Sequence, residues 1–160
     1  MSSDRRLFLL SALALGACGF TPAYGPGGGA AALQGQVRLD APADRKSYLL
    51  NQRMEERLGH APAGRFRLSY ALKTGTSGLG TASDGQTTRY HLSGSATWTL
   101  KDADDQVAAS GKVSSFTAYS ATGSTAATQA SERDALERLM TILADQLVDQ
   151  LLLQSPGLGA

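Results

Sequence analysis

The chain has 160 residues, with 15 Lys and Arg, 14 Asp and Glu, and a single cysteine. This length suits one domain with a sizeable core, and one cysteine excludes a disulfide within the chain. The near balance of charge excludes a general nucleic-acid binder, because such a surface needs a large excess of cations.

The first residues have the pattern of a bacterial secretory signal. Arg5 and Arg6 precede an uncharged apolar run over residues 7–15, and small residues then lead to Cys18. The run is too short to cross the roughly 30 Å hydrocarbon core of a bilayer, which favours a cleaved signal over a transmembrane helix. We therefore predict a signal peptide over residues 1–17. An ordinary cleaved signal with a chance cysteine is the alternative to a lipid attachment site.

The remaining chain divides into a linker, a domain and a tail. Cleavage before Cys18 removes two basic residues and one acidic residue, which leaves 13 Lys and Arg against 13 Asp and Glu. Residues 18–33 combine Cys18 with a run rich in glycine, proline and alanine, which predicts a flexible tether. A single domain is expected over residues 34–154, and a disordered tail over residues 155–160.

Alternation of apolar and polar residues predicts four strands. A short strand is expected within residues 34–39, and half-buried strands are expected over residues 65–73 and 88–101. A fourth strand begins at Val107 with the same alternation. Residues 75–86 are rich in Gly and Ser, so a loop is expected there.

The alternation changes phase within the fourth strand, where Phe116 falls on the opposite parity from Val113. A β-bulge near Ser114 and Ser115 would restore the apolar face. The alternative is that Phe116 packs on the outer face of the sheet. The sequence leaves both explanations open.

One amphipathic helix is predicted over residues 43–58, where apolar residues recur on a single stripe. Asp44 is the expected N-cap, and Gly59 is the expected residue that ends the helix. Tyr48 lies beside the stripe.

A second, longer helix follows the last strand, with leucines at helical spacing as far as Leu152. Its start near Ser124 or Thr125 is left open. Ser131 begins a sequence that fits a capping box, which predicts a firm start there. Pro156 and Gly157 are expected to end it. The stripe is most simply explained as core, because the polar face is too acidic for a helix that lies on an anionic bilayer.

The expected order is therefore β-α-β-β-β-α. Strands with one apolar face and two amphipathic helices to cover it define an α+β two-layer sandwich, a four-stranded sheet with two helices on one face. The other face of the sheet, or one edge, stays open.

Patterns that would indicate catalysis are few. His60 and His91 lack the spacing of a metal site, and both are expected on the surface. The glycine-rich segment 75–85 lacks both phosphate-binding patterns, and no serine lies in a nucleophile elbow. We therefore expect no enzyme and no cofactor.

A basic surface is the remaining candidate site. Residues 38–101 contain ten basic and five acidic residues, whereas residues 102–149 contain three basic and eight acidic ones. The alternation places a set of basic side chains on the polar face of the sheet: Arg65, Arg67, Lys73, Arg89, His91, Lys101 and Lys112. Such a face suits an anionic partner with phosphates or carboxylates, although an ordinary solvated face remains the alternative.

Several segments together resemble a known family. Leu15-Gly16-Ala17-Cys18 resembles a bacterial lipobox, and it is followed by CGFTPAYG, TRYHLSGSATWTLKD, QVAASGKVSSFTAYSATGS and ATQASERDALERLMTILADQLVDQLLL. In this order they resemble the alphaproteobacterial form of the LptE (RlpB) family of lipopolysaccharide-assembly lipoproteins. Ala23 departs from the family pattern, where Leu is usual.

The resemblance implies a lipid anchor and a location. Cys18 would carry a diacylglycerol and often a further acyl chain such as palmitate on its new amine. Gly19 after the cysteine favours the outer membrane over the inner membrane. The expected location is therefore the periplasmic side of the outer membrane and the lumen of a β-barrel.

The resemblance also implies a non-catalytic role. Members sit inside the outer-membrane barrel LptD, plug it, assist its assembly and bind lipopolysaccharide on its way to the cell surface. By hypothesis, Lys73, Arg89, Lys101 and Lys112 contact the lipopolysaccharide phosphates. The alternative is a periplasmic auxiliary lipoprotein of another envelope lipid-transport or assembly complex. No nucleic-acid partner is expected.

Overall fold

The computed structural model describes residues 29–81 and 87–155. The expected signal peptide and Cys18 lie outside these residues, as do residues 156–160 of the expected tail. The elements follow in the order α2 (Gly29–Leu33), β1 (Val37–Leu39), α3 (Arg45–Leu58), β2 (Phe66–Thr81), β3 (Thr87–Lys101), β4 (Val107–Ser120) and α4 (Thr125–Gln154).

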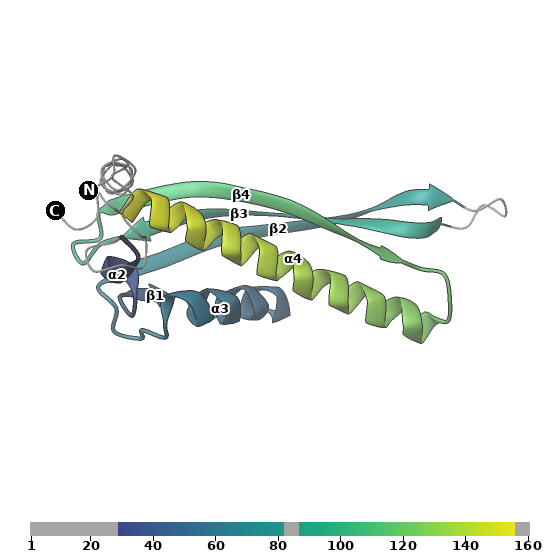
Figure 1. The fold of residues 1–160 in the computed structure, drawn as a ribbon, viewed down its shortest axis with the longest axis horizontal. Coiled ribbons are helices and arrows are strands. Elements are labelled where there is room, and N and C mark those ends of the chain that lie inside the picture. The colour runs from purple at the N-terminus through teal and green to yellow at the C-terminus, as the bar shows by residue number, and fades with distance from the viewer. Residues whose placement is uncertain (1–28, 82–86, 156–160) are drawn as a thin grey trace, which may run out of the picture.

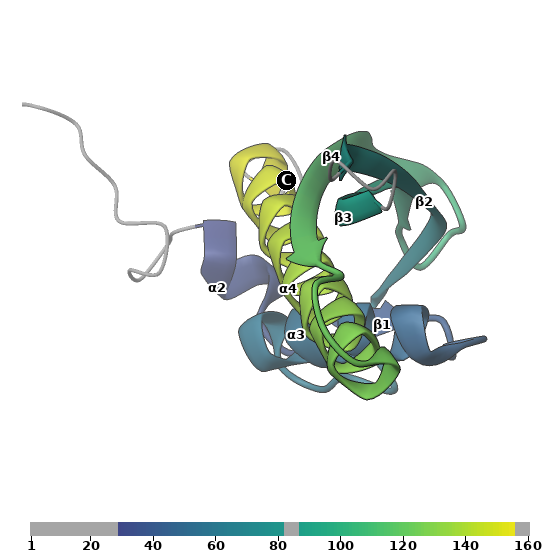
Figure 2. The same cartoon turned by 90° about the vertical axis from the view of Figure 1, so that its right-hand side faces the viewer.

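The four strands form one mixed sheet in the order β1-β2-β3-β4. β1 runs parallel to β2, and the other two pairs are antiparallel. Helices α3 and α4 lie on the same side of this sheet, as the two views show (Figures 1 and 2). The predicted α+β two-layer sandwich is confirmed. We call the face away from α3 and α4 the outer face, the β1 end of the sheet proximal and the end at the β2–β3 connection distal.

Helix α3 begins and ends where its sequence predicts. The Asp44 carboxylate accepts from the Ser47 backbone N–H at 2.8 Å, and the Ser47 hydroxyl lies 2.9 Å from the Asp44 N–H, which completes a capping box. Leu50 and Met54 face inward and are fully buried. Gly59 ends the helix with a φ of 83°, a value that residues with a side chain rarely adopt.

Helix α4 begins earlier than its strongest sequence pattern predicts. Ser124 is the N-cap, and its hydroxyl accepts from the Ala127 backbone N–H. Ser131 lies inside the helix, where its hydroxyl donates to the Ala127 carbonyl oxygen at 3.0 Å. The start near Ser124 or Thr125 is therefore confirmed, and the predicted firm start at Ser131 is wrong, because the Ser131 hydroxyl donates to a carbonyl within the helix and caps no N–H group.

The core lies between the sheet and α4. Trp98 is fully buried, and its indole N–H donates to the Gln150 side-chain oxygen at 3.1 Å. Gln150 in turn donates to the Lys112 carbonyl oxygen, so one polar side chain of α4 bridges β3 and β4. The predicted stripe of α4 is confirmed by its fully buried members: Leu139, Met140, Leu143, Leu147 and Leu151.

Ion pairs join α3 to α4 along their shared border. Arg53 Nε lies 2.9 Å from a carboxylate oxygen of Asp145, and Arg57 pairs with both Asp145 and Asp149. These side chains are partly exposed, so each pair stabilises the fold by less than about 1 kcal/mol. Together they connect α3 to α4 at two successive acidic positions, Asp145 and Asp149.

The expected loop over residues 75–86 is wrong for its first part, because β2 continues to Thr81. Gly75, Thr76 and Ser77 pair with Ser93, Leu92 and His91 of β3 in an unbroken ladder. The register shifts only near Gly78 and Gly80. Residues 82–86 lie outside the described chain. Pairing with β3 therefore overrides the weak strand preference of glycine and serine.

The two explanations for Phe116 are now resolved. The ladder between β3 and β4 is continuous across Ser114 and Ser115, so the predicted bulge is absent from this part of the described chain. Phe116 lies on the outer face and is 65% exposed. The irregularity in this pair lies instead between Leu100 and Lys101, close to the β3–β4 turn.

The last residues of the predicted tether are folded. Residues 29–33 form helix α2, and Leu33 is fully buried in the core. The Gly35 backbone N–H donates to the Leu58 carbonyl oxygen at 2.7 Å, which joins this segment to the end of α3. The folded domain therefore begins at about Gly29 rather than at residue 34.

Candidate functional site: the open basic face of the sheet

The register places most of the predicted basic set on the outer face. Arg67 pairs with Lys101, and Lys112 pairs with Thr97, while residues of the opposite parity such as Leu68 and Leu100 are buried under the helices. By the same alternation the outer face holds Lys73, Arg89 and His91. The predicted shared face is thus observed for six of the seven residues.

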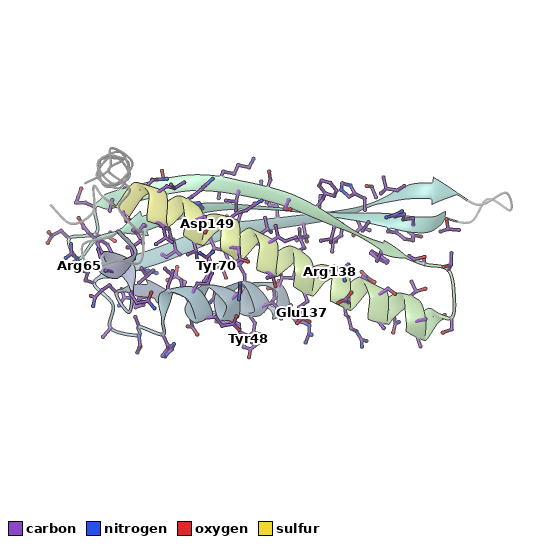
Figure 3. The ribbon with its side chains drawn as sticks, in the orientation of Figure 1. Tyr48, Arg65, Tyr70, Glu137, Arg138 and Asp149 are labelled. Atoms are coloured by element: carbon purple, nitrogen blue, oxygen red, sulfur yellow. The ribbon has the colours of Figure 1, made fainter. Side chains whose placement is uncertain are left out.

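Arg65 is the exception, because it precedes β2 at the proximal end (Figure 3). Its guanidinium carbon lies 4.6 Å from the centre of the Phe66 ring, a cation–π contact. Arg65 therefore belongs to the end of the sheet and not to the strand face.

The structure adds Arg38, which the sequence analysis missed. Arg38 of β1 pairs with Arg67 of β2, and Arg67 pairs with Lys101 of β3, so three cations form a row across the sheet. Only the parallel pairing of β1 reveals this row, and a three-residue strand gives no sequence indication of its partner.

Carboxylates neutralise the proximal part of the face. Arg67 Nε lies 2.9 Å from an Asp40 oxygen, and this hydrogen bond raises the pKa of Arg67. Lys101 Nζ lies 3.0 Å from an Asp105 oxygen. Two of the three cations in the proximal row therefore already have an anionic partner within the domain.

The distal part of the face is different. Strands β2, β3 and β4 contain no Asp or Glu at any position. Within the described residues, Lys73, Arg89 and Lys112 have no carboxylate within salt-bridge distance. Their positive charge is uncompensated, which favours an anion from outside the domain.

The four residues proposed to contact lipopolysaccharide do not converge on one point. Lys101 and Arg89 lie twelve positions apart on β3, which is about 40 Å along an extended strand. Lys73 and Lys112 lie between them, on β2 and β4. The set forms a stripe along the face, with Lys101 at its neutralised end.

A depression of about 580 Å³ lies in the middle of the stripe. Its lining includes Lys73, His91 and Phe116 with three serines between them, Ser93, Ser95 and Ser114. The rings of His91 and Phe116 meet edge to face, with centroids 4.7 Å apart. The alternation of the sequence places His91, Ser93 and Ser95 on this face and leaves the place of Phe116 open. Only the strand register shows which of these residues are neighbours.

Two smaller cavities lie elsewhere. One of about 330 Å³ lies on the helix side, where the distal hairpin and the first turns of α4 diverge, with Leu92, Leu136, Lys46 and Arg133 in its lining (Figure 1). Another of about 210 Å³ lies beside β1 and includes His60, whose ring nitrogen is 3.1 Å from a Glu55 oxygen.

Two further features of the described residues bear on the site. Residues 29–81 and 87–155 contain no group of three or more His, Cys, Asp or Glu side chains placed to hold a metal ion. Within the same residues, every helix is too short or too polar to cross a membrane.

The fold and the candidate site together define a two-layer α+β domain whose sheet presents an open, basic outer face. Comparison with a protein-family model assigns the chain to a family. The chain belongs to the LptE family, described as lipopolysaccharide-assembly, which matches residues 34–151. The family is one of non-catalytic assembly lipoproteins, so the chain is not an enzyme. No curated protein matches the sequence.

Solved structures share the fold at low sequence identity. A candidate lipoprotein from Caulobacter crescentus is 20% identical with a TM-score of 0.66, over 82% of this chain and 98% of that one. Rare lipoprotein B from Shewanella oneidensis is 14% identical with a TM-score of 0.55, over 78% and 98%. Lipoprotein B from Nitrosomonas europaea is 15% identical with a TM-score of 0.55, over 78% and 84%. At these identities the likeness concerns the fold alone.

Proposed function

We propose that this protein is the lipoprotein subunit of the outer-membrane lipopolysaccharide translocon. In this role it plugs the LptD β-barrel, assists the assembly of that barrel and binds lipopolysaccharide during its insertion into the outer leaflet. The observation that supports this best is the uncompensated positive charge on the distal outer face, at Lys73, Arg89 and Lys112. Lipopolysaccharide carries phosphates, which pair well with ammonium and guanidinium groups.

The proposed anchor is Cys18. Two or three acyl chains on this residue are enough for stable membrane attachment, since each buried CH₂ contributes about 0.8 kcal/mol. The residues between Cys18 and α2 number ten, which span at most about 35 Å when extended. The domain can therefore stand well clear of the bilayer surface and enter a barrel lumen from the periplasmic side.

Affinity purification from outer membranes tests the partner directly. The full-length protein with a C-terminal tag is extracted in mild detergent, and its partners are identified and quantified. We expect one large β-barrel in a near one-to-one ratio, with lipopolysaccharide attached. Recovery with inner-membrane transport subunits and without a barrel would contradict the proposal and favour an auxiliary lipoprotein of another envelope complex.

A charge-neutralised variant tests the lipopolysaccharide site. Replacing Lys73, Arg89, Lys101 and Lys112 together by Gln should weaken lipopolysaccharide binding by about fourfold to several hundredfold, because each exposed charge pair contributes about 0.2–1 kcal/mol. Lys101→Gln alone should have the smallest effect of the four single changes, because Asp105 already neutralises this residue.

The matched control removes cations from the helix side. Arg45 and Arg133 are exposed on α3 and α4, away from the outer face. The double variant Arg45→Gln with Arg133→Gln should bind lipopolysaccharide like the unchanged protein. Equal loss in both variants would show that net charge matters and that the outer face is not a site.

A further inference from the structure

The floor of the outer-face depression is made of small residues. Lys73, Ser95 and Ser114 form one row across β2, β3 and β4, and Gly75, Ser93 and Phe116 form the next row. Because Gly75 has no side chain and the serines are short, the centre of these rows is hollow. The large side chains stand at its border, with Lys73 on β2 and Phe116 on β4.

Aromatic, hydroxyl and cationic groups all face this hollow. Phe116 is 65% exposed, and its ring meets the neighbouring ring of His91 edge to face. The face of an aromatic ring carries partial negative charge and packs well against polarised C–H groups. Within the described residues, the hydroxyls of Ser95 and Ser114 make no hydrogen bond, so they can donate to and accept from a ligand.

This combination suits a particular ligand class. An acyl chain needs a continuous apolar groove, whereas this lining has one exposed aromatic side chain among hydroxyls. A free phosphate uses the lysine but has no need of the ring. A sugar ring with an attached phosphate or carboxylate can contact all three kinds of group. Its C–H face packs on the aromatic ring, its hydroxyls bond to the serines, and its anionic group pairs with the lysine. The volume of about 580 Å³ lies within the usual range of ligand sites.

We propose that the depression binds an anionic saccharide, with the sugar face on Phe116, its hydroxyls on Ser95 and Ser114, and its phosphate or carboxylate on Lys73. The inference rests on the proposed function only for the source of this saccharide, the polar part of lipopolysaccharide. It adds that recognition on this face is of the saccharide and does not require acyl chains.

The experiment uses the full-length protein in a non-ionic detergent and lipopolysaccharide from which all acyl chains have been removed. Binding is followed by NMR through the Phe116 ring and His91 ring resonances. We expect saturable binding that Phe116→Ala and Lys73→Gln each weaken about tenfold. Val107→Ala and Arg45→Gln are the matched controls, since Val107 is 61% exposed on the same strand outside the depression, and both should change binding less than twofold.

Small probes separate the possible sources of binding. Glucose 1-phosphate should shift the same resonances, and it should do so more strongly than inorganic phosphate or glucose at equal concentration. Inorganic phosphate that matches glucose 1-phosphate would overturn the inference, because the cation alone would then explain binding. An unchanged affinity in Phe116→Ala, with its thermal unfolding also unchanged, would overturn it as well.

Intact lipopolysaccharide distinguishes this inference from the proposed function. If the protein binds intact lipopolysaccharide but not the deacylated form, the translocon proposal stands and the saccharide site is wrong. If it binds neither form, both are wrong.

Discussion

At the residue scale, the Tyr70 hydroxyl joins the sheet to α3. Tyr48, which belongs to α3, points away from the sheet (Figure 3). The Tyr70 hydroxyl lies 2.6 Å from the Asn51 side-chain oxygen, and Asn51 is itself 6% exposed. Tyr70→Phe removes this donor and leaves a buried acceptor unpaired, which should lower the free energy of unfolding by about 1–3 kcal/mol in urea titrations. Tyr48→Phe is the matched control, and because Tyr48 is 56% exposed it should change stability by less than about 0.5 kcal/mol.

The same hydroxyl gives a pH dependence with a definite sign. Burial raises the pKa of Tyr70 to about 12, above the value of 10.0 expected without the fold. The unfolded chain therefore loses this proton first, so the contribution is complete below pH 10 and is lost as the pH rises from 10 to about 12. Stability should fall more steeply over this range in the unchanged protein than in Tyr70→Phe. Parallel curves for the two proteins would show that the hydroxyl is not buried.

At the element scale, the packing of α4 depends on the absence of a side chain at Gly111. A Cβ added there would lie 2.7 Å from a ring carbon of Trp98 and 2.8 Å from the Gln150 side-chain oxygen. Trp98 is fully buried and cannot move aside, so Gly111→Ala should destabilise the domain by about 1–3 kcal/mol. Thermal unfolding followed by tryptophan fluorescence measures this loss.

Gly80→Ala serves as the control in the same sheet. The nearest atom to a Cβ added at Gly80 is 3.7 Å away, which is an ordinary contact. The transition temperature of this variant should stay close to that of the unchanged protein. An equal loss in both variants would point to a general cost of replacing strand glycines and not to a clash with Trp98.

Elements with a complete local pattern could be predicted from sequence. Helix α3 has a cap, an apolar stripe and a terminal glycine, and its observed bounds differ from the predicted ones by two residues at one end. The distal half of β2 has none of these indications. Its glycines and serines become a strand because β3 pairs with them across the hairpin, and pairing of this kind depends on register and not on local composition.

The candidate site could likewise be predicted where it depends on a local pattern and not where it depends on strand pairing. Alternation alone predicted that Lys73, Arg89, Lys101 and Lys112 share a face, and the register agrees. Alternation says nothing about which residues lie side by side on neighbouring strands. Two contacts could be found only in the structure: the ring contact between His91 and Phe116, and the ion pair between Lys101 and Asp105. The first shows where the face carries an exposed aromatic ring, and the second shows which cation is already neutralised.

At the scale of the whole molecule, the separation between a neutralised proximal region and an uncompensated distal one predicts a strong salt dependence. The screening length falls from about 10 Å at 0.1 M salt to about 3 Å at 1 M. Lipopolysaccharide binding should therefore weaken at least tenfold over this range, measured by titration of the full-length protein. The fourfold Gln variant should show a much shallower dependence, whereas an identical slope would mean that other charges of the molecule attract the ligand.

The position of α4 after the last strand of the sheet has a consequence for folding. This helix supplies eight buried residues to the core, and the sheet that it covers ends at Ser120, 34 residues before the end of the helix at Gln154. The apolar side of the sheet, with Trp98 and Leu100, stays uncovered until α4 packs on it. A chain interrupted after Ser120 exposes that surface permanently, together with the open edge of β4, and such exposed apolar surface and strand edges promote aggregation. The domain therefore completes its core only when α4 has packed against the sheet.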